Sequence, residues 1–98
     1  MDIARVKGTV VATRKDQKLV GNKLLLLELA DVSGKDKSGA QLVALDALDA
    51  GVGDLVLVVR GSSARQAKGM STTPVDAIVI GIIDTIDFDG ETTYKVAR

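Results

Sequence analysis

Histidine, cysteine and tryptophan are absent from this chain of 98 residues, and proline, phenylalanine and tyrosine each occur once. Without histidine or cysteine, the chain lacks the most common general base, the thiolate nucleophile and the usual zinc ligands. Disulfide bonds are excluded for the same reason. We therefore expect a protein that is not an enzyme, with no catalytic residues, no metal site and no cofactor.

Excess charge of either sign is also missing, because 13 basic and 13 acidic residues give a formal net charge of zero. A nucleic-acid-binding protein normally gathers a basic excess on one face and offers aromatic rings on which bases stack. This composition argues against nucleic acid as a partner. Near-zero net charge also removes the repulsion that keeps copies apart, so it favours self-association.

Long hydrophobic runs are the third absence. The apolar runs are the length of a strand and far shorter than a membrane span. The N-terminus, residues 1–5, shows no charged region followed by a long apolar stretch, so we expect no signal peptide. A soluble protein of the cytosol, with no membrane partner, is the default expectation.

Aliphatic residues supply most of the hydrophobic content, which is 46% of the chain. A length of 98 residues suits one small domain, residues 1–98, with a thin core of valine, isoleucine, leucine and alanine. Neither disulfides nor metals supplement that core. Association of subunits is then a physically reasonable source of additional buried area.

Short runs rich in valine, isoleucine and threonine, separated by turn residues, predict an all-β domain. Gly8 lies inside the first run and predicts a bulge or sharp bend, which lets a sheet curl into a small barrel. Ser62 or Ser63 is suited to cap one helical turn over residues 64–67. Polar or glycine-rich loops are expected at 14–22, 33–39, 49–54 and 68–74. The expected strands are 3–13, 23–29, 41–46, 55–60 and 77–86.

The dipeptide Asp89-Gly90 between two strand-like runs predicts a terminal β-hairpin with a two-residue turn. That turn would pair Phe88 with Glu91, Ile86 with Thr93 and Asp84 with Lys95, and would place Ile83, Thr85, Tyr94 and Val96 on the other face. The predicted architecture is a partly open five-stranded barrel with one short helix and a C-terminal hairpin. The barrel would span about residues 1–86 and the hairpin about 82–97.

Two segments allow a catalytic or anion-binding interpretation beside a structural one. Residues 49–54 contain two glycines that could expose amides to a phosphate, but no Lys-Ser/Thr pair and no helix follows, which favours a tight turn. Ser62 and Ser63 could form a nucleophile with Lys68 in principle. Small hydroxyl groups beside Arg65 fit hydrogen bonding at a close-packed subunit boundary better.

The acidic residues Asp84, Asp87 and Asp89 raise the question of a calcium site. An EF-hand loop needs its glycine at the sixth position and its glutamate at the twelfth, and this spacing does not match. The hairpin explains the same residues without a metal.

Several motifs occur together in a specific order along the whole chain. They are IARVKGTVVAT at 3–13, GNKLLL at 21–26, ALD at 44–46, AGVGD at 50–54, VLV at 56–58, GSSARQ at 61–66, PVDA at 74–77 and GIID at 81–84. With this order and spacing, the chain resembles the bacterial microcompartment vertex proteins, the EutN/CcmL family.

The resemblance implies a small barrel similar to an oligonucleotide-binding (OB) fold, assembled as a cyclic homopentamer. Such pentamers occupy the fivefold vertices of a polyhedral shell in the bacterial cytoplasm, beside hexameric and pseudohexameric shell proteins. The implied function is structural, in a carboxysome or a metabolosome. A single-stranded nucleic-acid-binding module is the alternative, and fold alone is weak support for it. A small hydrolase is a more remote one.

The resemblance also implies roles for particular segments. The family turn Gly-Ala-Gly-x-Gly-Glu lies near the contact with hexamers, and Asp49 replaces its leading glycine here. The implied shell-contact residues are Asp49, Ala50, Gly51, Val52, Gly53, Asp54, Gly81, Ile82, Ile83 and Asp84. Pentamer packing or the central opening would involve Gly61, Ser62, Ser63, Ala64 and Arg65. The terminal hairpin is expected to reach towards a neighbouring subunit, because an isolated two-stranded ribbon is only marginally stable.

Overall fold

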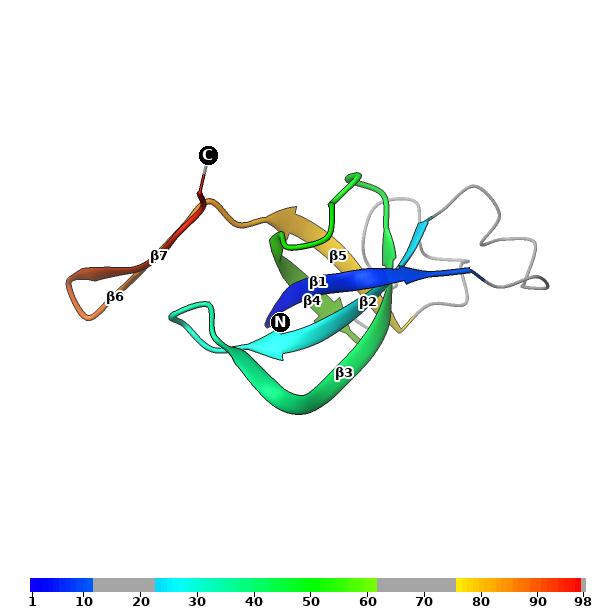
Figure 1. The fold of residues 1–98 in the computed structure, drawn as a ribbon, viewed down its shortest axis with the longest axis horizontal. Helices are drawn as coiled ribbons and strands as arrows, with labels where there is room; N and C mark the ends of the chain where they lie inside the picture. Colours follow the sequence, from blue (N-terminus) through cyan, green and yellow to red (C-terminus); the bar gives the residue numbers. More distant parts are fainter. Residues whose placement is uncertain (12–22, 62–75, 98) are drawn as a thin grey trace.

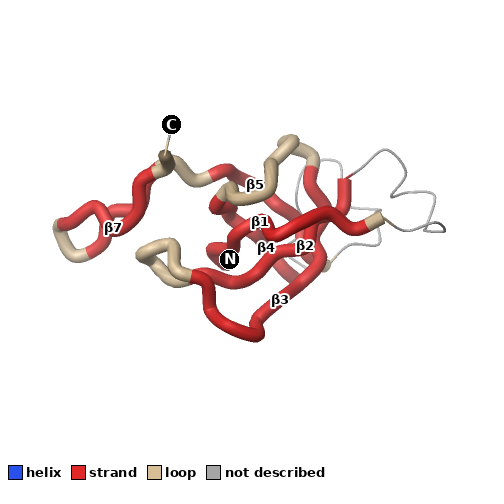
Figure 2. The backbone as a smooth tube through the Cα atoms, viewed as in Figure 1, coloured by secondary structure: helices blue, strands red, loops and turns tan. Residues whose placement is uncertain are grey.

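The computed structural model describes residues 1–11, 23–61 and 76–97, and within these residues the chain is entirely β-structure joined by turns (Figures 1 and 2). The expected helical turn, with Ser62, Ser63, Ala64 and Arg65, lies outside the described residues, as do the loops at 14–22 and 68–74. The strands are β1 (Asp2–Val10), β2 (Lys23–Ala30), β3 (Asp36–Asp46), β4 (Leu55–Arg60), β5 (Ala77–Ile82), β6 (Thr85–Phe88) and β7 (Glu91–Lys95).

Five of these strands form a closed barrel in the order β1-β2-β3-β5-β4. All neighbours are antiparallel except β3 and β5, which are parallel and pair only through Leu45 with Ile78 and Asp46 with Val79. The all-β, OB-like prediction is confirmed. The barrel is closed, not partly open as the sequence suggested, because this short parallel seam completes the circuit.

The bulge expected near Gly8 is present in β1. Val6 pairs with Leu27 and Gly8 pairs with Leu26, so Lys7 is the extra residue. A bulge of this kind bends the strand and increases its twist, which helps a five-stranded sheet to close. Lys7 itself is exposed, so the insertion costs no core contact.

Two strand boundaries differ from the prediction. β3 begins at Asp36, inside the polar stretch expected to be a loop, because backbone pairing of Ala30 with Asp36 does not depend on apolar side chains. The expected strand 77–86 is interrupted after Ile82, where the chain leaves the barrel and starts the separate β6–β7 sheet.

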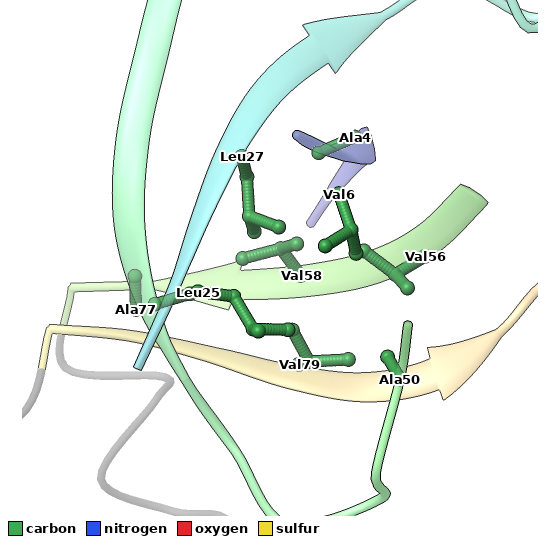
Figure 3. Packing of buried hydrophobic residues seen from close by; sticks show 10 residues of the cluster. Ala4, Val6, Leu25, Leu27, Ala50, Val56, Val58, Ala77 and Val79 are labelled. Atoms are coloured by element: carbon green, nitrogen blue, oxygen red, sulfur yellow. The ribbon is translucent and has the colours of Figure 1, made fainter. Parts of the chain in front are cut away.

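The core is aliphatic, as the composition requires. Large side chains from β1, β2, β4 and β5 meet inside the barrel, and alanines fill the space between them (Figure 3). The cluster consists of Ala4, Val6, Leu25, Leu27, Ala44, Ala50, Val56, Val58, Ala77 and Val79. Each fully buried valine or leucine contributes about 1.5–3 kcal/mol relative to exposure. A second cluster at one end of the barrel joins Leu55 and Ile83 to Ile86 and Tyr94 of the hairpin.

The hairpin forms with the expected turn but with a different register. Phe88 pairs with Glu91 as predicted, whereas Ile86 pairs with Tyr94 and Thr85 with Lys95. The predicted pairs Ile86 with Thr93 and Asp84 with Lys95 are therefore wrong, and so is the predicted grouping of Thr85 with Tyr94 on the other face. The irregularity lies beyond Asp87 and brings two large apolar side chains, Ile86 and Tyr94, against the barrel end. Their burial favours this register over an unbroken ladder.

Candidate interaction surfaces

The 49–54 turn links β3 to β4 and lies against β1. Gly53 N donates to Val6 O over 2.8 Å, and Val6 N donates to Asp54 O over 2.9 Å. Asp54 also closes the turn on itself, since its N–H donates to Gly51 O and its carboxylate accepts from Gly51 N. The turn expected from the sequence is thus held in place by hydrogen bonds to β1 and by hydrogen bonds within the turn.

Asp46 and Lys23 anchor the first half of this turn. Asp46 is only 3% exposed, and its two carboxylate oxygens accept the N–H groups of Leu48 at 2.9 Å and Ala50 at 2.8 Å. Lys23 Nζ donates to Ala50 O at 2.9 Å and to Asp49 Oδ1 at 3.0 Å. Buried backbone groups that would otherwise lack partners are therefore satisfied, and Ala50 is held in the core.

Backbone conformation distinguishes two positions of the turn. Asp49 has φ 61° and Gly53 has φ 94°. Asp49 adopts the left-handed region that a glycine would adopt more easily, and aspartate tolerates this region better than most residues. Val52, which lies between these two residues, is 70% exposed. The turn presents an apolar side chain to solvent from a rigid base.

Arg5 connects the 49–54 turn to the turn that follows β2. Its Nη1 donates to Gly53 O at 2.8 Å, its Nη2 to Gly34 O at 2.6 Å, and its Nε to Asp36 Oδ1 at 3.0 Å. The planar guanidinium group presents several donors in fixed directions, which suits one residue to bridge three partners.

Lys7 and Arg5 both contact Asp36. The hydrogen bond from Lys7 Nζ, with support from Arg5, holds the pKa of Asp36 below its usual value. The same hydrogen bond raises the pKa of Lys7, and Glu28 lies 3.6 Å from the ammonium group. These side chains are partly exposed, so their charges join the strands at a smaller desolvation cost than a fully buried ion pair would have.

The 31–35 turn forms the seat of the hairpin. Asp31 Oδ1 accepts from Ser33 Oγ and from the N–H groups of Ser33 and Lys35, and these bonds lower the pKa of Asp31. Thr93 Oγ1 donates to Val32 O. At Gly34, φ is 80° and an added Cβ would lie 2.7 Å from a ring carbon of Tyr94. Only glycine fits beneath this ring.

Residues 81–84 pass from the barrel to the hairpin beside the 49–54 turn. Ile82 pairs with Val56, Ile83 N donates to Leu55 O at 2.8 Å, and Val96 N donates to Asp84 O at 2.8 Å. Because Leu55 directly follows Asp54, the structure brings together the two segments to which the resemblance gave a shell contact. Ile83 is buried, and Ile82 is exposed.

Gly61 lies at the opposite end of β4 from the 49–54 turn. It has φ 66°, and its N–H donates to Asp76 O at 2.7 Å. It lines a surface hollow of about 520 Å³ together with Arg60 and Val43. Gly61 is therefore separated from the other two segments, and residues 62–65 lie outside the described part of the chain.

Neither a metal site nor a membrane-spanning helix is found among the described residues. Within residues 1–11, 23–61 and 76–97, no group of three or more acidic side chains is placed to hold a metal ion. Asp87, considered for calcium, accepts instead from Thr92 Oγ1 at 2.7 Å. In the same described ranges, no helix has the length and apolar character needed to cross a bilayer.

Sequence reasoning gave no role to Arg5, Lys23 or Asp46, although all three lie in the motifs that carry the resemblance. Each is a charged residue within or at the end of a strongly apolar run. A charge in such a place needs a partner, because burial without one is costly. That position is the signal that could have marked them as anchors of the neighbouring turns.

The fold and its surfaces define a class of protein: a small OB-like barrel with rigid exposed turns and an appended hairpin. Residues 1–84 match the family described as "Ethanolamine utilisation protein EutN/carboxysome". The chain belongs to this family.

Individual relatives agree with this assignment over nearly the whole chain. It is 48% identical over 95 residues to the carboxysome shell vertex protein CcmL of Gloeobacter violaceus, covering 97% of this chain and 94% of that protein. It is 43% identical over 94 residues to the bacterial microcompartment shell vertex protein EutN of Salmonella typhimurium, covering 96% and 94%.

Solved structures give the same result. The structure of Gloeobacter violaceus CcmL matches with a TM-score of 0.89 at 47% identity, covering 97% of each chain. The GrpN pentameric microcompartment shell protein of Rhodospirillum rubrum matches with a TM-score of 0.80 at 40% identity, covering 90% of this chain and 99% of that one.

Proposed function

We propose that this chain is a structural shell protein that forms cyclic pentamers at the fivefold vertices of a bacterial microcompartment, within the bacterial cytoplasm. The observation that carries the proposal is similarity over nearly the full length to proteins named as shell vertex proteins, with a matching fold. One of the structural relatives is described as pentameric. The microcompartment is a carboxysome or a metabolosome.

The proposed role is geometric and not catalytic. A flat sheet of hexamers closes into a polyhedron only if fivefold positions interrupt it, and a closed ring of five identical subunits supplies such a position. The absence of histidine and cysteine fits a protein without a reaction to catalyse. The nucleic-acid alternative finds no support in the balanced charge or in the scarcity of aromatic residues.

The shell contact is proposed to involve Asp49–Asp54 and Gly81–Asp84, facing hexameric or pseudohexameric shell proteins. Three observations support this assignment: the segments are adjacent, the first is rigidly anchored, and Val52 and Ile82 expose apolar surface. Exposed apolar side chains on a fixed backbone are typical of protein contacts. Gly61–Arg65, of which the structure describes only Gly61, is proposed for packing between pentamer subunits or around the central opening.

The first test is the mass of the purified chain by native mass spectrometry. Five copies of a 10.2 kDa chain give about 51 kDa, the mass expected of a closed ring. A stable monomer or dimer would contradict the proposed function.

The shell contact is tested separately by replacing Val52 with aspartate. Because Val52 is exposed and makes no core contact, Val52→Asp should keep the pentamer and reduce its binding to sheets of hexameric shell protein. Val11→Asp, the same change at another exposed valine, is the matched control and should bind normally. Equal binding by both variants would remove the 49–54 turn from the interface. Gly53 is a poorer target, since its φ of 94° makes any substitution there strained.

A further inference from the structure

Arg5 joins two turns that lie far apart in the sequence. Its Nη1 donates to Gly53 O at 2.8 Å, inside the turn proposed to contact the shell, and its Nη2 donates to Gly34 O at 2.6 Å, inside the turn that seats the hairpin. The two acceptors lie 48 and 29 residues away from Arg5. One side chain therefore connects the proposed shell contact with the base of the β6–β7 hairpin.

On the hairpin side, Gly34 lies between Arg5 and Tyr94. The Tyr94 ring covers this glycine so closely that an added Cβ would lie 2.7 Å from a ring carbon. The carbonyl of the same glycine accepts the hydrogen bond from Arg5. Thr93 Oγ1 donates to Val32 O in the same turn. The position of the hairpin base therefore influences where one acceptor of Arg5 lies.

On the shell side, Gly53 directly follows Val52, the exposed apolar residue of the 49–54 turn. Gly53 N donates to Val6 O and Gly53 O accepts from Arg5, so two neighbouring residues of β1 hold this glycine. Glycine has more backbone freedom than any other residue, and each such bond restricts it. The hydrogen bond from Arg5 therefore helps to fix the direction in which Val52 points.

The planar guanidinium group makes this connection rigid. Its Nε donates to Asp36 Oδ1 at 3.0 Å, and the Arg5 side chain is only 23% exposed. Donors in one plane hold their three acceptors in fixed positions relative to one another. A lysine in this place would carry the same charge, but it has no planar fork with which to hold all three.

We propose that Arg5 is a positioning residue that couples the seating of the hairpin to the shape of the 49–54 turn. With Tyr94 seated, Arg5 holds Gly53 and directs Val52 towards hexameric shell protein, and this hold weakens when the hairpin base lifts. A two-stranded ribbon is only marginally stable by itself, so its base is the element that changes state. The inference rests on the proposed function, because it takes this turn as the shell contact.

Arg5→Lys tests the positioning role without changing the charge. The variant should keep the mass of the pentamer and bind sheets of hexameric shell protein about fivefold more weakly or worse, as is typical of coupling between two sites. Lys7→Gln is the matched control, because it removes another partner of Asp36 and leaves the bonds of Arg5 to both turns in place. It should bind as the unmodified chain does. Equal losses in the two variants would assign the effect to the charge cluster and overturn the positioning role.

A double-mutant cycle with Tyr94→Ala tests the coupling itself. Tyr94→Ala removes the ring from Gly34 and should also weaken binding to the hexamer sheets, although Tyr94 lies outside the proposed shell contact. Since both changes act through one connection, Arg5→Lys/Tyr94→Ala should bind no more weakly than the weaker single variant. Losses that multiply would show that the two residues act independently. If Tyr94→Ala does not form pentamers, Thr93→Val, which removes only the hydroxyl bond to Val32, takes its place in the cycle.

Hydrogen exchange of the unmodified pentamer gives a readout that needs no substitution. Coupling is reciprocal, so binding of hexameric shell protein should slow exchange of the β6–β7 amides. Arg5→Lys should abolish this slowing, which separates coupling from direct cover of the hairpin. Exchange that does not respond to binding, or that slows equally in both chains, would contradict the proposal.

The two proposals fail in different ways. If the unmodified pentamer does not bind hexamer sheets, the proposed shell contact itself is wrong. If Val52→Asp weakens that binding and Arg5→Lys does not, the shell contact stands and only the positioning role of Arg5 is wrong.

Discussion

Asp46 is the residue on which the shape of the 49–54 turn most depends. Its side chain is buried, and both oxygens accept backbone N–H groups of the segment that leads into the turn. It also pairs with Val79 across the barrel seam. Asp46 therefore takes part in the closure of the barrel through its backbone and fixes the position of the turn through its carboxylate.

Replacing Asp46 with asparagine should destabilise the fold by about 1–3 kcal/mol, because the amide NH₂ cannot accept and leaves one buried N–H without a partner. The measurement is chemical denaturation followed by circular dichroism. Asp89→Asn is the matched control: it makes the same chemical change in the exposed hairpin turn, where asparagine is equally suited to φ 56°. Equal stability of the two variants would show that Asp46 is not an anchor.

The cluster of Lys7, Arg5 and Asp36 predicts a dependence of stability on pH. Since the pKa of Asp36 is lowered on folding, its stabilising contribution is complete above its ordinary pKa of about 4 and is lost as the pH falls through the lowered value. The melting temperature of Asp36→Asn should lie below that of the parent at pH 7 and approach it towards pH 2–3. A difference that stays constant down to that pH would contradict the role of this carboxylate.

At the scale of elements, the junction between the hairpin and the barrel depends on Gly34. An added methyl group would meet Tyr94 at 2.7 Å, and φ is 80°. Gly34→Ala should therefore loosen the hairpin base, seen as faster hydrogen exchange of the β6–β7 amides and a lower melting temperature. The backbone strain alone costs roughly 1–2 kcal/mol.

Gly39→Ala separates the strain from the contact. Gly39 has a similar φ of 83° and no atom within 4 Å of an added Cβ. The Gly39→Ala variant should lose stability through backbone strain only, and hydrogen exchange of its β6–β7 amides should stay normal. If both variants change hairpin exchange equally, the contact of Tyr94 with Gly34 does not hold the hairpin.

Strands and turns with strong local signals could be predicted from the sequence. The runs at 23–29 and 55–60, the Asp89-Gly90 turn and the bulge beside Gly8 were found from hydrophobic pattern and turn chemistry alone. The start of β3 was missed, because Asp36 pairs with Ala30 through its backbone and residues 36–40 carry no hydrophobic period.

The hairpin register was missed for a different reason. The two-residue turn fixes pairing only near itself, and the shift beyond Asp87 follows from burying Ile86 and Tyr94 on a barrel end that lies far away in sequence. The three hydrogen-bond partners of Arg5 were missed for the same reason, since they lie 29 to 48 residues away from Arg5 in the sequence. Local patterns do not contain such contacts.

At the scale of the whole molecule, composition alone excluded more classes of function than it identified. It indicated one aliphatic β domain, no familiar catalytic chemistry and a reason to associate. The expectation of a shell vertex protein came from the ordered motifs and not from composition. The relatives with matching folds agree with that expectation. The placement of 49–54 beside 81–84 needed the fold, because their adjacency depends on the pairing of β4 with β5.

The parallel seam between β3 and β5 has a consequence for how the barrel opens. It joins its strands through only two residue pairs, so we expect the barrel to open here more easily than at its longer ladders. Asp46 belongs to that seam and also holds the 49–54 turn. We therefore expect a chain whose barrel has opened at this seam to lose the shape of the 49–54 turn as well, and with it the surface proposed to join the shell.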